Sequence, residues 1–222
     1  MRKHLQKNNI KLVYFDFPFW RVDICKLALS IASIRFETKK ISKRFFILNK
    51  ESEQFPFGQV PVLVVDNRII AQTSAMIRYC GKISELYPND IYECAMIDQT
   101  IDFANEITNF IIPSIREKDL KIKRTKRKEL NEVILPKWLK YLERFYMKNN
   151  SSNYFLTKKF TISDIIIWRI LLWLTSGKLE NINLGLNKNF PNLNNYFKFI
   201  NTYKPLINSS EFKDIIDNQT IL

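Results

Sequence analysis

The chain has 222 residues, of which 46% are hydrophobic, so it is long enough for one large or two small domains and too apolar to be disordered. Its 4 glycines and 3 cysteines exclude collagen-like and disulfide-scaffold classes, and no apolar run approaches the roughly 18 residues of a membrane span. The formal net charge of +13 belongs to a chain rich in Lys, Asn and Ile, so we interpret it as compositional bias that still favours the approach of small anionic substrates.

The first part of the chain mixes strand and helix patterns. Runs rich in β-branched and aromatic residues predict four strands, at 10–17, 36–41, 60–65 and 68–71. The last two are joined by Asp66-Asn67, which predicts a hairpin. Apolar residues at helical spacing predict helices over 22–33 and 73–86. Residues 42–57 show no clear period, and we expect an irregular segment with about one helical turn there.

After residues 87–91, which contain Pro-Asn-Asp and predict a linker, only helix patterns remain. The expected helices span 91–116, with a kink near Pro113, and then 130–148, 161–176, 190–201 and 205–217. Pro136 lies inside the second of these and argues against it. This order predicts an α+β first domain over 1–86, with 1–9 as an extension, and an all-helical second domain over 92–222.

Two stretches carry a family resemblance. Residues 57–63 read Phe-Gly-Gln-Val-Pro-Val-Leu, and residues 71–79 read Ala-Gln-Thr-Ser-Ala-Met-Ile-Arg-Tyr. Together with the order of elements, they resemble cytosolic glutathione transferases, closest to the tyrosine-type classes (alpha, mu, pi and sigma). The resemblance implies a thioredoxin-like first domain that binds glutathione as co-substrate, without a metal.

Tyr14 lies in the first predicted strand, where the resembled family has its catalytic tyrosine. A thiol with the ordinary pKa of about 8.5 is mostly protonated at neutral pH, whereas the thiolate is the nucleophile. A phenol that donates a hydrogen bond to sulfur favours the charged form. The resemblance therefore implies that Tyr14 activates glutathione. Taken alone, a strand tyrosine is more often a core aromatic, and that alternative stays open.

The resemblance also implies a grip on the glutathione backbone. The bond before Pro61 is expected to be cis, so that the main chain of Val60 pairs with the cysteinyl unit; an ordinary trans proline at a strand start is the alternative. Gln72 and Thr73 stand at a strand-to-helix junction, where unpaired N–H groups and the positive end of the helix dipole suit a carboxylate. Thr73 is equally interpreted as an N-cap.

Three further glutathione contacts are implied at Gln59, at Lys50 and at Glu106, the last reaching the ligand of the partner subunit. Lys50 is otherwise a solvated charge.

The turn after Tyr14 resembles the corresponding turn of the family at two positions, Arg21 and Asp23. Arg21 is a second catalytic candidate. The turn departs at Trp20, which replaces a glycine, and at Pro18, which replaces an arginine. Phe19 and Trp20 are expected either to line an apolar pocket for the electrophile or to cover the helix.

Other candidates are weighed from the residues alone. His4 is the single histidine, which excludes a Ser-His-Asp triad unless it folds back into a site. Three separated cysteines indicate a reducing compartment, and none lies near residues 17–20, where thiol-transfer relatives carry theirs. The basic start is not followed by an apolar segment, so no secretory signal is expected. Thr161 and Asp164 form a predicted capping box with a structural role.

The basic run 118–128 admits two interpretations. It is either a patch for nucleic acid or an anionic membrane, or a solvated face in a Lys-rich chain, and the sequence favours the second.

We therefore expect a cytoplasmic, homodimeric glutathione transferase of detoxification type, with no nucleic-acid partner and no membrane span. It would conjugate an apolar electrophile or isomerise a small substrate. The alternative is a glutathione-transferase fold kept as a non-catalytic binding or assembly module. Phe57 is a candidate for the dimer contact, or else is buried in its own domain.

Overall fold

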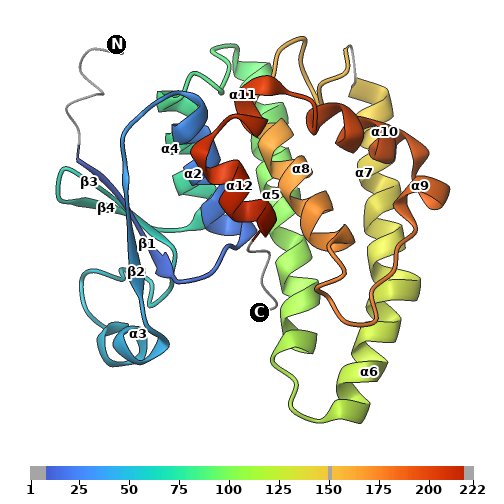
Figure 1. Cartoon of the computed structure of the whole chain (residues 1–222), viewed down its shortest axis with the longest axis horizontal. Coiled ribbons are helices and arrows are strands. Elements are labelled where there is room, and N and C mark those ends of the chain that lie inside the picture. Colours follow the sequence, from blue (N-terminus) through green and yellow to red (C-terminus); the bar gives the residue numbers. More distant parts are fainter. Residues whose placement is uncertain (1–8, 150–151, 218–222) are drawn as a thin grey trace. The chain divides into compact units, whose positions relative to one another are not determined.

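A computed structural model of the chain describes residues 9–149 and 152–217, which form two compact units (Figure 1). Residues 9–89 together with 204–217 form the first unit, and residues 90–203 form the second. His4 lies outside the described residues. Within the described ranges, no helix is long and apolar enough to cross a membrane.

The first unit is built on a four-stranded sheet in the order β2-β1-β3-β4. Its strands are, along the chain, β1 (Ile10–Phe15), β2 (Glu37–Ile41), β3 (Val62–Val65) and β4 (Arg68–Ile70). β1 runs parallel to β2 and antiparallel to β3, and β4 is antiparallel to β3. All four predicted strands are confirmed, each somewhat shorter than the sequence pattern. With the helical second unit, this confirms the thioredoxin-like plus all-helical fold.

The two faces of the sheet have separate cores because side chains alternate along a strand. Val13 packs with Ile41, Phe55 and Val62 on one face. Leu12 and Tyr14 therefore point to the other face, where both are buried. On that side, α2 (Trp20–Ile31) contacts β1, α4 (Thr73–Ile83) contacts β3, and the two helices contact each other.

The segment expected to be irregular contains a helix, α3 (Lys43–Asn49). Ser42 caps it by accepting a hydrogen bond from the Phe45 N–H at 3.0 Å. The sequence pattern did not predict this helix, because its apolar residues Ile47 and Leu48 are exposed. Its apolar residues therefore do not follow the helical spacing of a buried face.

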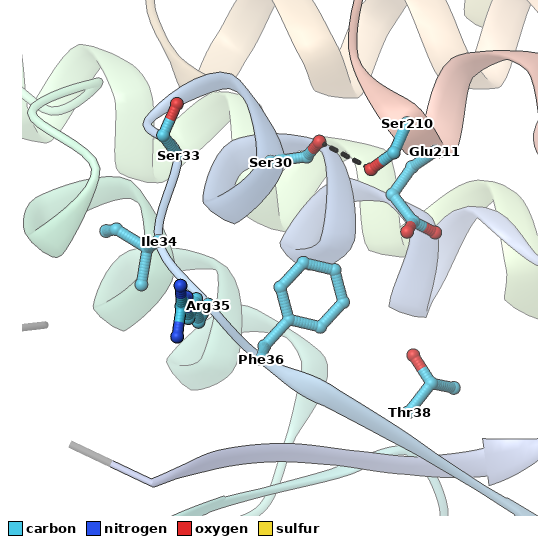
Figure 2. A pocket seen from close by; sticks show the side chains of 8 residues that line it. All are labelled: Ser30, Ser33, Ile34, Arg35, Phe36, Thr38, Ser210 and Glu211. Carbon is cyan, nitrogen blue, oxygen red and sulfur yellow. Dashed lines mark hydrogen bonds between the residues drawn. The ribbon is translucent and has the colours of Figure 1, made fainter. Parts of the chain in front are cut away.

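The last two helices, α11 (Lys204–Ile207) and α12 (Ser210–Asp217), belong to the first unit and not to the helical one, which differs from the predicted domain bounds. Both contact α2. Lys26 lies 3.6 Å from Glu211, and the hydroxyls of Ser30 and Ser210 meet at 3.0 Å (Figure 2). Such long-range contacts leave no mark in the local sequence pattern.

The second unit is a helical bundle. Its helices are α5 (Ile91–Ile115), α6 (Leu120–Glu129), the π-helical turn η1 (Leu130–Ile134), α7 (Leu135–Asn149), α8 (Ile162–Thr175), α9 (Leu186–Asn189) and α10 (Pro191–Ile200). α8 is buried along almost its whole length and contacts both α5 and α10. The ring of Phe103 on α5 stacks on Trp138 of α7 at 4.6 Å.

The basic run 118–128 is mostly helical and continues into the next predicted helix through η1. Pro136, which argued against that helix, lies just after the π-helical turn. A proline has no N–H to donate and its ring collides with the preceding helical turn, so a locally widened turn accommodates it.

The predicted capping box at the start of α8 is confirmed. Asp164 Oδ2 accepts a hydrogen bond from the Thr161 N–H at 2.8 Å. Asp164 also holds a neighbouring segment, because its Oδ1 accepts from the Phe155 N–H at 2.8 Å and from the Tyr196 hydroxyl at 3.1 Å. The box therefore joins three parts of the bundle, which the local motif alone did not indicate.

Candidate functional site

The strand register brings Tyr14 and Pro61 to the same end of the two central strands, β1 and β3. β1 and β3 are paired antiparallel from Ile10–Val65 to Val13–Val62. Tyr14 and Pro61 are the next residues of the two chain segments beyond this last pair. The two sequence motifs, about fifty residues apart, therefore meet at the end of β1.

The peptide bond between Val60 and Pro61 is cis, as the resemblance implied. Val60 lies just outside the paired part of β3 and is half-buried. Its N–H and C=O thus lie beyond the last residue pair of β1 and β3, Val13 with Val62.

Tyr14 is 6% exposed and lies in an aromatic cluster. Its ring centroid is 5.4 Å from that of Phe17 and 6.4 Å from that of Phe19, with which it stacks. Burial raises the pKa of the Tyr14 phenol well above its usual value, Asp23 raises it further, and Arg21 lowers it. The hydroxyl is therefore protonated throughout the physiological pH range and is a hydrogen-bond donor.

Arg21 and Asp23 lie in the first turn of α2 and act electrostatically on the phenol. The Arg21 guanidinium carbon stands 5.7 Å from the centre of the Trp20 ring. Phe19 is almost fully buried and Trp20 completely so. Trp20 therefore contributes to packing at the start of α2, and its role in an electrophile pocket stays a prediction.

Gln72 and Thr73 form the start of α4, but their roles in the helix differ from the sequence interpretation. Gln72 is the N-cap and has a φ of 69°, whereas Thr73 is the first helical residue and is buried. The N-cap interpretation of Thr73 is thus wrong by one position. The start of α4 still presents first-turn N–H groups, the arrangement that binds anions at helix N-termini.

Comparison with known proteins identifies the family. The family model for the N-terminal domain of glutathione S-transferase matches residues 10–82, and the model for the C-terminal domain matches residues 102–206. The chain belongs to the glutathione S-transferase family. It is accordingly a glutathione transferase of the cytosolic superfamily, an enzyme with glutathione as its substrate, and nothing supports the alternative of a non-catalytic module.

Individual relatives cover most of the chain. A glutathione S-transferase of Plasmodium yoelii yoelii is 29% identical over 189 residues, covering 81% of this chain and 80% of the relative. Glutathione S-transferase 1 of Ascaris suum is 31% identical over 160 residues, covering 71% and 76%. Among solved structures, prostaglandin synthase D of Nilaparvata lugens has a TM-score of 0.75 and 25% identity, covering 96% of this chain and 100% of that one.

The chemistry of the donor set in this glutathione transferase fits the tripeptide. Glutathione presents carboxylates, amides and a thiol. The start of α4 offers backbone donors for a carboxylate, Val60 offers a main-chain donor and acceptor, and Tyr14 offers a neutral hydroxyl for sulfur. The three groups come from the same unit and stand at neighbouring strand ends.

The remaining predicted contacts of the enzyme are more exposed. Lys50 follows α3, lies 3.6 Å from Glu51, and borders a surface depression of about 620 Å³ over residues 50–58. Gln59 is exposed next to Val60. Glu106 lies on α5 in the second unit, where it is exposed. The roles of Lys50, Gln59 and Glu106 therefore stay predictions.

One charged pair near Tyr14 was missed by sequence reasoning. Lys40 is the register neighbour of Tyr14 on β2, and its Nζ lies 2.6 Å from Asp16 Oδ1. This hydrogen bond raises the pKa of Lys40. The only signal for the pair is the parallel register of β1 and β2, which a single sequence does not reveal.

Two other features of the first unit are unsuited to thiol chemistry. The pocket of about 510 Å³ in Figure 2 is lined by Phe36 and Thr38 at the start of β2, whereas Tyr14 stands near the end of β1. Because β1 and β2 are parallel, the pocket and Tyr14 lie toward opposite ends of the sheet. Cys25 is buried, and a hydrogen bond with Cys80 together with burial raises its pKa, so it is an inert thiol.

Proposed function

We propose that Tyr14 activates the glutathione thiol as a thiolate that attacks an apolar electrophile or serves in isomerisation. In conjugation, the thiol proton passes to solvent, a carbon–sulfur bond forms, and the leaving group departs with its electron pair. The proposal is carried by the register of β1 and β3, whose last pair, Val13 and Val62, is followed by Tyr14 on one side and preceded by the cis Pro61 on the other. A phenol held neutral by its burial donates to sulfur without losing its own proton.

The other residues of the proposal hold the tripeptide. Val60 pairs its main chain with the cysteinyl unit, and Gln72 and Thr73 bind a carboxylate at the start of α4. Lys50 and Gln59 add contacts at the rim, and Arg21 supports the thiolate through its positive charge. Glu106 binds the glutathione amine of the partner subunit, and Phe19 and Trp20 line the electrophile pocket.

We also propose a cytoplasmic homodimer that serves detoxification. The dimer follows from the family, whose members are typically dimeric. The cytoplasmic location is supported by Cys25, Cys80 and Cys94, which form no disulfide and so fit a reducing compartment.

Tyr14→Phe is the test. Removing the hydroxyl removes one donor to the developing thiolate, so kcat/KM toward 1-chloro-2,4-dinitrobenzene falls about a hundredfold. The pH at which activity rises also shifts upward, because the bound thiol loses the interaction that lowers its pKa. Steady-state kinetics across pH measure both effects.

Calorimetric binding of glutathione and thermal unfolding are the controls, and both stay near the wild-type values in Tyr14→Phe. Wild-type turnover and an unshifted pH profile in this variant contradict the mechanism. If the wild-type protein is retained on immobilised glutathione but shows no turnover, the result instead favours the alternative of a non-catalytic binding module.

A further inference from the structure

The solvent-facing side of one long helical segment is cationic, and thiol chemistry does not use it. α6, η1 and α7 follow one another without a break, so residues 120–149 form a rod about 45 Å long at 1.5 Å per residue. Figure 1 shows α6 and α7 running end to end. This segment is called the α6–α7 rod below.

The α7 part of the rod has a buried apolar side and an exposed cationic side. Its buried side is formed by Leu135, Trp138, Leu139, Leu142 and Tyr146. Its exposed cations are Lys137, Lys140, Arg144 and Lys148, spaced by three or four residues and so on one face. Its one acidic residue, Glu143, is half-buried and accepts a hydrogen bond from the Asn192 N–H at 2.8 Å. The exposed face of α7 therefore carries four positive charges and no negative one.

The α6 part repeats the arrangement. Lys121, Arg124 and Lys128 are exposed at spacings of three and four residues. The half-buried Lys126 and Lys123 are instead paired inside the unit, with Glu117 at 2.6 Å and Glu180 at 3.9 Å. The exposed Glu129 and Glu132 lie between the two cationic stretches, so seven exposed cations on the rod outnumber its two exposed carboxylates.

Apolar side chains stand among these cations. Leu120 is 69% exposed at the start of α6, and Met147 is 53% exposed near the end of α7. Tyr141 is 42% exposed, and its ring lies 6.0 Å from the Lys137 nitrogen and 5.3 Å from the Arg144 guanidinium carbon. A tyrosine flanked by cations is suited to the headgroup level of a bilayer, where an aromatic ring and a positive charge are both favourable.

We propose that the exposed side of the α6–α7 rod binds an anionic phospholipid surface. The charge is complementary to such a surface, and Lys and Arg near it each strengthen binding about fivefold. The exposed Leu120, Tyr141 and Met147 gain from insertion between headgroups, whereas phosphates of a nucleic acid offer them nothing. A second copy of the chain that docked by this same face would meet like charge, which disfavours it as the occupant.

The test is sedimentation of the full chain with phosphatidylcholine vesicles, with and without phosphatidylserine. One variant combines four neutralising changes on α7: Lys137→Gln, Lys140→Gln, Arg144→Gln and Lys148→Gln. A matched control makes the same charge change at exposed lysines elsewhere in the unit: Lys158→Gln, Lys159→Gln, Lys178→Gln and Lys188→Gln. A third variant combines Tyr141→Ser with Met147→Ser. Circular dichroism and thermal unfolding establish that each variant is folded.

The expected result is binding to phosphatidylserine vesicles that weakens with salt and falls more than about tenfold in the α7 variant. The control binds more tightly than the α7 variant, and the third variant loses affinity for vesicles. Absence of binding at low ionic strength overturns the proposal, as does an equal loss in the control. Tighter binding to duplex DNA than to vesicles, insensitive to Tyr141→Ser with Met147→Ser, also overturns it and assigns the face to polynucleotides.

Discussion

Burial has different consequences at two titratable residues of the structure. Tyr14 is kept neutral, which makes its hydroxyl a donor at the end of β1. Asp164 accepts hydrogen bonds from Phe155, Thr161 and Tyr196, yet burial raises the pKa of its carboxyl to about 6. In the first case burial keeps a hydrogen-bond donor in its neutral form, and in the second it links stability to the protonation of a carboxyl group.

Asp164 makes the free energy of unfolding depend on pH. Its pKa is about 6 when folded and near 3.8 when unfolded, so between these values the folded state holds a proton that the unfolded state has released. This contribution to stability is complete below pH 4 and is lost as the pH rises through about 6. Asp164→Asn removes that dependence.

Urea unfolding of wild type and Asp164→Asn from pH 4 to pH 8 measures the difference in stability between the two. A constant difference across this range contradicts the assignment. Thr161→Ala tests the cap separately and costs about 0.5–2 kcal/mol. The cost is larger above pH 6 than below pH 4, because the Thr161 hydroxyl donates to Asp164 and lowers the pKa of that carboxyl.

Among the elements, α12 packs in a unit whose other residues are distant from it in the sequence. Ile215 is completely buried on α12, whereas the adjacent Ile216 is 38% exposed. Ile215→Ala therefore destabilises the first unit by about 2–5 kcal/mol through lost burial and the cavity left behind. Ile216→Ala is the matched control and changes stability by less than about 0.5 kcal/mol. Chemical denaturation monitored by circular dichroism measures both, and equal effects would show that α12 does not pack as described.

The elements that the sequence predicted are those with strong local patterns. β1 and β3 are dense in β-branched residues, and α8 has both an apolar run and a capping box. The cis bond before Pro61 came only from the family resemblance, because most bonds before proline are trans. The placement of α12 on α2 and the pair of Lys40 with Asp16 depend on contacts distant in sequence, which no local period encodes. The pattern of α3 was absent because Ile47 and Leu48 face solvent, whereas Phe46 alone of its apolar side chains is packed against the core.

At the scale of the whole molecule, the proposed dimer gives a further prediction. Phe57 is 64% exposed, which excludes the alternative that it is buried within its own unit and leaves it available to a partner. Phe57→Ser shifts the protein from dimer toward monomer, since it removes an apolar contact of about 1.5–3 kcal/mol. Ile122→Ser, at another exposed apolar position, is the control and leaves the assembly unchanged. Sedimentation equilibrium measures the association, and a dimer unaffected by Phe57→Ser contradicts this role.

The grouping of 204–217 with 9–89 has a consequence for biosynthesis. The ribosome makes the sheet first and the whole helical bundle next, and only afterwards the two short helices that contact α2. The described helices of the bundle, α5 to α10, have all been made once residue 203 emerges. The first unit has part of α2 uncovered until residues 204–217 emerge, so the unit whose synthesis begins first acquires its last described helices after the bundle has been made.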